Sequence, residues 1–159
     1  MGTKIYLKYN EIKGSVTEAG HKDWVELDSF NLRASRSVSQ DTGTSRRSVS
    51  TPSISAISIS KRMSLCSAPI FQESLSGTPA TKCIIHFVSD TGKVFNEYDL
   101  TGAVISSYET SAVENGSEPV EHLQIHFTAI RKTHTHTTPE GKSGSPFSVG
   151  YDLLLAKKI

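Results

Sequence analysis

Apolar and polar residues alternate along most of the chain, which is the pattern of β-strands that bury one face. The first such stretch is residues 4–9, where two sets of residues alternate: Ile5, Leu7 and Tyr9 in one set, and Lys4, Tyr6 and Lys8 in the other. Successive side chains of a strand point to opposite faces, so this stretch predicts a strand that buries the first set and exposes the second. Residues 11–22 include Gly14 and Gly20 and predict a loop, after which residues 24–32 resume a strand pattern.

One segment departs from the strand pattern and predicts a helix. Apolar residues fall near helical spacing over residues 63–76, and Gly77 supplies a C-terminal stop. Pro69 lies inside this segment, and proline is best tolerated in the first turn of a helix. We therefore expect the regular helix to start just before Pro69, with Ser67 as its N-cap.

Strands are predicted for the rest of the chain. Single strands are predicted at residues 53–62, 100–113, 120–137 and 147–156, and a hairpin is predicted at 82–98 with its turn at 90–92. The alternation shifts phase after Ala56 in the first of these strands, and the second has a break at Gly102. The expected core includes Ile5, Leu7, Trp24, Leu123, Ile125 and Phe127. Many strands and one helix, without a strand–helix alternation, predict a mainly β fold. We expect an antiparallel β-barrel or sandwich with one short α-helix packed at its side, in a single domain over residues 1–159.

Residues 33–52 form a polar segment rich in serine and arginine. We expect this segment to provide no apolar anchor for the core before Ile54. A loop of this length is uncommon inside a compact domain. The segment is therefore either a linker between two pieces or an extended arm with a use outside its own domain.

Composition narrows the possible partners. The chain has 159 residues, 17 basic and 16 acidic, so its net charge of +1 provides no general attraction to nucleic acid or to an anionic membrane. No apolar run approaches the roughly 18 residues that span a bilayer, and the N-terminus lacks the apolar region of a signal peptide. We expect synthesis in the cytoplasm and no stable membrane insertion. Cys66 and Cys83 are expected to be buried free thiols, with one disulfide as the alternative.

Candidate chemistry is sparse. His134 and His136 share one face of a strand, and His122 and His126 have the same parity, so a zinc site is conceivable. We favour a solvent-facing strand without metal. No serine lies in a nucleophile elbow, and the stretch at residues 141–145 lacks the upstream glycine of a phosphate loop. We expect neither an enzyme nor a bound cofactor.

The polar segment contains the charged residues of greatest interest. Arg33, Arg36, Arg46 and Arg47 lie among serines there, together with Asp41. Arginines can bind phosphates, but no aromatic residues are interleaved with them and the rest of the chain is not basic. A stand-alone module that binds nucleic acid with this arm is therefore the weaker hypothesis.

Several stretches resemble one family in order along the chain. They are "IYLKYNEIKGSVTEAGHKDWVELDSF" at residues 5–30, in which Ile12, Gly14, His21 and Lys22 match best, Ser67-Ala68-Pro69, and "GYDLLLAKKI" at residues 150–159. Together they resemble the haemolysin-coregulated protein (Hcp) family, the tube protein of bacterial type VI secretion systems. Phe30 stands where family members often have tryptophan, and the arginine- and serine-rich segment replaces a glycine-rich one.

The resemblance implies a β-barrel with a side helix that assembles into a homohexameric ring. Rings would stack into a tube inside a contractile sheath, beneath a spike protein, with secreted effectors in the lumen. It implies export to the medium or a target cell without a cleaved signal peptide. The extended loop at about residues 33–52 would contact the next ring, with Arg33, Arg36, Asp41, Arg46 and Arg47 as candidates for ring stacking. The tail-tube protein of a phage or phage-derived contractile particle is the alternative.

Overall fold

A computed structural model describes residues 2–40, 47–138 and 140–159. Its larger sheet has the order β15 (Lys157–Lys158), β14 (Ser143–Asp152), β13 (Ala129–Thr137), β10 (Val94–Thr101), β9 (Cys83–Val88), β1 (Lys4–Tyr9) and β2 (Val25–Leu27). A smaller sheet has the order β11 (Val104–Ser111), β12 (Val120–His126), β8 (Ile57–Arg62) and β3 (Ser29–Asn31). Helix α1 (Ser67–Ser76) packs on β11. All pairings of the described strands are antiparallel.

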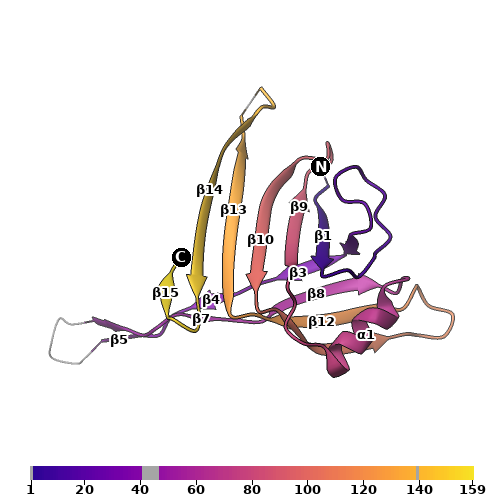
Figure 1. Cartoon of the computed structure of the whole chain (residues 1–159), viewed down its shortest axis with the longest axis horizontal. Coiled ribbons are helices and arrows are strands. Elements are labelled where there is room, and N and C mark those ends of the chain that lie inside the picture. Colours follow the sequence, from indigo (N-terminus) through magenta and orange to yellow (C-terminus); the bar gives the residue numbers. More distant parts are fainter. Residues whose placement is uncertain (1, 41–46, 139) are drawn as a thin grey trace.

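The two sheets cross each other. In Figure 1 the strands of the larger sheet stand upright, and those of the smaller sheet run crosswise beneath them, with α1 at one end. The mainly β class with one side helix is therefore confirmed. Within the described residues the two sheets stay open, so the arrangement is closer to a crossed sandwich than to a fully closed barrel.

The core lies between the sheets and follows the predicted alternation. Leu123, Ile125 and Phe127 are buried, whereas the polar residues between them face solvent. Leu7 is buried as predicted, and Ile5 is half-buried against the same cluster. Trp24, also expected in this core, is instead half-buried in a second cluster with Tyr6, Val16 and Val88. Interdigitated side chains from both sheets form one contiguous cluster, which places the strands that carry the surfaces described below.

Three predicted strands divide where the chain passes from one sheet to the other. Residues 24–32 form β2 in the larger sheet and β3 in the smaller one, and residues 120–137 divide in the same way into β12 and β13. The third corner is Gly102, whose φ of +65° suits glycine. A Cβ there would lie 2.6 Å from Oγ1 of Thr128, at the neighbouring corner. The break predicted at Gly102 is confirmed, because β10 ends at Thr101 and β11 begins at Val104. The alternation continues through the other two corners, so it does not reveal them.

Two local predictions are wrong. Tyr6, expected on the exposed face of β1, is buried because the loop after β1 folds over that face and places Val16 and His21 against it. Ser67 is not the N-cap, since α1 begins at Ser67 itself and Cys66 occupies the cap position. The Ser67 hydroxyl instead accepts the backbone N–H of Ser64 at 2.9 Å and donates to a buried carboxylate.

That carboxylate belongs to Glu121, which forms a buried ion pair with Lys61. The Lys61 Nζ–Glu121 Oε1 distance is 2.7 Å, and the two side chains are 1% and 0% exposed. Ser67 donates to the same oxygen at 2.7 Å and Tyr108 donates to the other. Burial raises the pKa of Glu121, but the hydrogen bonds from Lys61, Tyr108 and Ser67 outweigh burial and hold that pKa below its usual value. The pair thus ties α1 to two strands of the smaller sheet.

We expect Lys61→Met to lower the free energy of unfolding by about 3–5 kcal/mol, because it leaves the Glu121 charge buried without its cation. The double variant Lys61→Met/Glu121→Leu should recover most of the loss, since it removes both charges. Arg62→Met, which removes an exposed pair with Asp28 at 3.7 Å, is the control and should change stability by under about 1 kcal/mol. Urea unfolding measures all three. Equal effects of the Lys61 and Arg62 substitutions would contradict this account.

Candidate assembly interface

The polar segment folds into a two-stranded arm. β4 (Ala34–Ser35) pairs with β7 (Ser53–Ile54), and β5 (Val38–Gln40) pairs with β6 (Arg47–Val49). Serine hydroxyls add rungs between the two strands: Ser50 Oγ accepts the backbone N–H of Ser37 at 2.8 Å, and Ser55 Oγ accepts that of Arg33 at 3.0 Å. Figure 1 shows the arm projecting from the end of the molecule that carries β14 and β15. The expected extended loop is thus, in its described part, a β-ribbon.

The predicted stacking residues are only partly described. Arg33 and Arg36 are exposed on the outgoing side of the ribbon. Asp41 and Arg46 lie outside the described residues. Arg47 is placed by its backbone, which pairs with Gln40. A role for these residues in stacking therefore stays a prediction.

Sequence reasoning missed two apolar residues on the arm. Val38 and Val49 are directly opposite each other in the ribbon and are 62% and 49% exposed. Each is flanked by serines on both sides, and this repeated Ser-Val-Ser pattern is the signal that could have revealed an exposed cross-strand pair. The arm therefore offers apolar as well as basic groups to a partner.

An apolar groove of about 230 Å³ lies at the base of the arm. Its walls include Leu32, Ile54, Tyr98, Ile130, Val149 and Tyr151. Lys132 lies at its rim, where the Lys132 Nζ donates to the Tyr98 hydroxyl at 2.9 Å and sits 4.9 Å from the centre of the Tyr98 ring. The groove joins the arm to β10, β13 and β14.

The neighbouring strand β14 leaves part of its outer edge open. It pairs with β13 along its length, but on the other side only Tyr151 and Asp152 pair with β15. Within the described residues, 143–149 therefore have a strand partner on one side alone. Phe147 and Val149 on this stretch are 73% and 51% exposed. Unpaired edge groups and exposed apolar side chains favour pairing with another chain.

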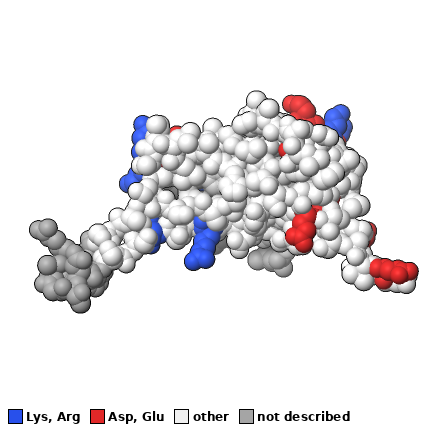
Figure 2. All heavy atoms as spheres, turned by 90° about the horizontal axis from the view of Figure 1, so that it is seen from below, with Lys and Arg blue, Asp and Glu red and all other residues white. Residues whose placement is uncertain are grey.

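Large exposed apolar residues gather at two ends of the molecule. The arm-side surface consists of Val38, Val49, Phe147, Val149, Leu154, Leu155 and Ile159. The helix-side surface consists of Met63, Leu65, Phe71 and Leu75. Figure 1 places α1 at the end opposite the arm. Charge divides in the same sense: on the face seen in Figure 2, Lys and Arg lie mostly toward the arm, and Asp and Glu mostly away from it.

The histidines predicted as possible zinc ligands do not come together. His122 and His126 are on β12 of the smaller sheet, His134 and His136 are on β13 of the larger one, and all four are exposed. Among the described residues, no group of three or more His, Cys, Asp or Glu side chains could hold a metal ion. His122 instead lines a polar hollow of about 390 Å³ on the smaller sheet, together with serine and glutamine side chains.

The cysteines offer no reactive thiol. Cys66 and Cys83 are buried and free, as predicted. Burial, with a smaller contribution from the Asp99 charge, raises the pKa of Cys83 to about 12. The described part of the chain also contains no helix long and apolar enough to cross a membrane.

These features describe a mainly β protein with exposed apolar surfaces at both ends. Residues 6–134 match the family model described as "Type VI secretion system effector, Hcp". The chain therefore belongs to the Hcp family, the tube proteins of type VI secretion systems. Proteins of this family are secreted components of these systems.

Solved structures share the fold. A structure of a type six secretion system protein has a TM-score of 0.94 at 22% identity, covering 99% of this chain and 100% of that one. Hcp1 from Salmonella typhimurium has a TM-score of 0.81 at 18% identity, with 100% of each chain covered. A chain in the structure of the anti-feeding prophage baseplate has a TM-score of 0.53 at 9% identity, covering 82% of this chain and 91% of that one. A sequence comparison with curated proteins gives no match.

We expect the protein to need no structural metal, because its exposed histidines are divided between two sheets. Addition of EDTA should leave the melting temperature and the native mass unchanged. Calorimetry and native mass spectrometry measure these. A fall of several degrees on adding the chelator would overturn the expectation.

Proposed function

We propose that this protein is the tube subunit of a type VI secretion system and forms homohexameric rings. The observation that carries the proposal is the pair of uncovered apolar surfaces at opposite ends of one chain. A contact between two different surfaces of identical subunits is heterologous, and such contacts close into a ring when the rotation between subunits allows it. The proposed number of six subunits per ring comes from the resemblance to the family. The open edge of β14 gives the subunits a further reason to associate.

The arm would join one ring to the next. It projects away from the body, contributes exposed Arg33 and Arg36, and presents the Val38–Val49 pair at its surface. Carboxylates gathered away from the arm on the face in Figure 2 would meet these arginines on a neighbouring copy. Each contact is modest, but a ring repeats it around its circumference.

The remaining partners follow from the proposed assembly. A stacked tube would lie inside the contractile sheath, contact the spike protein, and leave the cell during firing. Secreted effectors would travel in the lumen, where the protein acts as a carrier and performs no chemistry. The supporting observation is that the chain belongs to a family of structural tube proteins.

A tail-tube role in a phage-derived contractile particle is the second candidate, favoured by the likeness to the anti-feeding prophage baseplate. Both candidates predict rings, and the genes that neighbour this one would separate them. A module that binds nucleic acid through the arm predicts no ring at all.

Val149→Glu tests the ring, because it places a charge on the open edge of β14. We expect native mass spectrometry to show a hexamer for the unmodified protein at tens of micromolar and mostly monomer for Val149→Glu, with unchanged circular dichroism. The control is Val113→Glu, the same change at a valine that is 77% exposed and lies away from β14, in the loop between β11 and β12. An unmodified protein that stays monomeric at low and moderate salt would refute the proposal. Equal masses for the two variants would contradict a role for β14 in the interface.

Replacement of residues 37–50 by a tight glycine-containing turn tests the arm. We expect this variant to form rings but no tubes, because the described side chains of the replaced segment, at residues 37–39 and 48–50, are all exposed and loop-closure entropy varies slowly with length. Charge reversal of Arg46 and Arg47 to Glu should have the same effect, and raised salt should weaken stacking.

Size exclusion and electron microscopy distinguish these results. Normal polymerisation of the shortened variant would show that the arm has no part in stacking. Dissociation to monomers would place the arm in the ring itself.

A further inference from the structure

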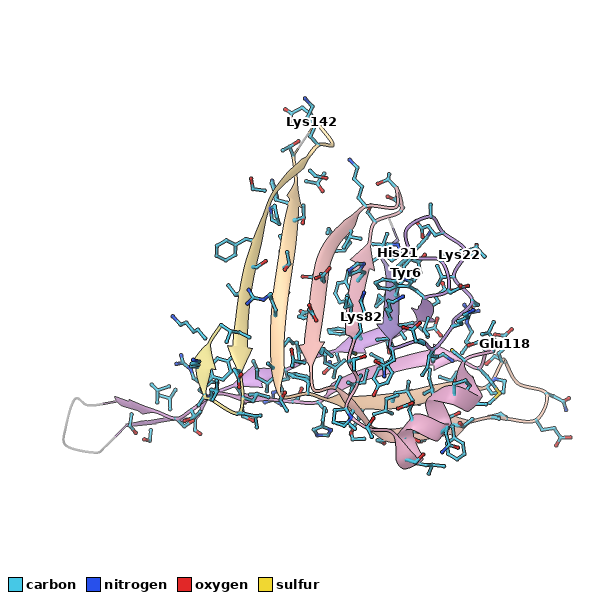
Figure 3. All side chains as sticks on the ribbon, viewed as in Figure 1. Tyr6, His21, Lys22, Lys82, Glu118 and Lys142 are labelled. Atoms are coloured by element: carbon cyan, nitrogen blue, oxygen red, sulfur yellow. The ribbon has the colours of Figure 1, made fainter. Side chains whose placement is uncertain are left out.

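The loop at residues 10–24, here called the N-terminal loop, covers the outward face of β1. It is closed on itself by backbone hydrogen bonds, including Gly14 N–H to Asp23 O at 2.7 Å and Asp23 N–H to Val16 O at 2.8 Å. Several of its side chains contact the larger sheet: Val16 packs with Tyr6 and Val88, and Glu18 accepts a hydrogen bond from the Tyr6 hydroxyl. His21 is the titratable group that the loop buries there, at 4% exposed. Figure 3 shows His21 beside Tyr6 of β1.

His21 sits in an aromatic cage. Its ring centre lies 5.0 Å from that of Tyr6, 4.8 Å from that of Trp24 and 5.1 Å from that of His86 on β9. Trp24 also packs on His86, with a centroid distance of 4.6 Å. A contact between two imidazoles is therefore part of the surface by which the N-terminal loop docks on the sheet.

A chain of hydrogen bonds fixes the protons of the two imidazoles. His21 Nε2 lies 2.9 Å from His86 Nδ1, and His86 Nε2 lies 2.7 Å from Glu97 Oε2. The Glu97 carboxylate accepts, so His86 carries a proton on Nε2. In the neutral pair, His86 Nδ1 then accepts from His21 Nε2–H. His21 Nδ1 is buried without a hydrogen-bond partner in the described structure.

This arrangement has room for one extra proton and not for two. A first proton on His86 Nδ1 is compatible with the contact if His21 moves its own proton to Nδ1, and Glu97 balances the charge. A second proton puts N–H groups on both atoms of the 2.9 Å contact. Two cations would then face each other with no acceptor between them, and the contact has to break.

The charged groups around the pair do not remove this conflict. They are Glu18, Glu26, Glu97 and Lys8. Glu18 on the loop accepts a hydrogen bond from the Tyr6 hydroxyl and pairs with Lys4 at 3.5 Å. Glu26 lies near Tyr6, Glu97 is bonded to His86, and Lys8 lies 6.0 Å from the Trp24 ring centre. Burial, followed by the charge of His86, lowers the pKa of His21, while Glu18 opposes them. Because the released loop would return His21 to its ordinary pKa near 6.5, acid favours release.

We propose that the His21–His86 contact is an acid-operated latch that releases the N-terminal loop from the larger sheet while both sheets stay folded. Release uncovers Tyr6 and the adjoining side of Trp24. The latch does not depend on the proposed tube function, since every group in it belongs to one chain. It also gives a role to His21, which the assembly interface does not use.

The protein contains its own reporter, because Trp24 is its single tryptophan. We expect Trp24 emission to shift to longer wavelength as the pH falls below about 6.5, with far-ultraviolet circular dichroism unchanged. Hydrogen exchange should show opening of residues 10–24 becoming up to about tenfold more frequent per pH unit, the limit for one proton taken up on release.

His21→Gln should abolish the emission transition, since glutamine does not titrate. His122→Gln removes an exposed histidine of the smaller sheet and should keep the transition of the unmodified protein. If His21→Gln is already released at neutral pH, the opening of residues 10–24, corrected for the intrinsic exchange rate, will be frequent and independent of pH, which also supports the latch. A transition that persists in His21→Gln, a flat titration of the unmodified protein, or simultaneous loss of circular dichroism would overturn it.

Discussion

The four-stranded sheet crosses the seven-stranded sheet and covers only part of it. The uncovered part of the larger sheet has to find a partner elsewhere, and this constraint shapes the rest of the molecule. β9 and β10 bury their inward side chains in the core, but most of β14 has both faces exposed. The arm extends the molecule beyond the same end. Apolar side chains there have little of their own chain to pack against, so a second copy is the natural cover.

Two buried polar clusters attach the segments that the strand pattern does not place. Lys61 and Glu121 hold α1 against the smaller sheet, and His21 and His86 hold the N-terminal loop against the larger one. The clusters differ in their response to acid. The ion pair retains its charges until the carboxylate is protonated, because the pKa of Glu121 is lowered. The histidine contact is broken by excess protons, because two N–H groups cannot face each other across it.

The spacing of apolar residues predicts the main strands of both sheets, the helix and the mainly β class, because burial of one face leaves a local signature. Apart from the break at Gly102, it does not predict the corners, since Phe127 and Ala129 stay in phase while the chain changes sheets. Contacts between distant residues were equally inaccessible: His21 and His86 are separated by 65 positions, and no local pattern pairs them. In the arm, the sequence predicted a role for the arginines but none for Val38 and Val49, because these two valines contribute nothing to a core.

Hydrogen exchange of β14 as a function of protein concentration tests the central claim most directly, because it reports on the open edge itself. If another copy covers the edge, the amides of residues 143–149 that point away from β13 will become protected as assembly proceeds. Amides of β12, which has strand partners on both sides, will exchange at the same rate throughout. Unchanged exchange of β14 across the range in which the mass increases would contradict the account.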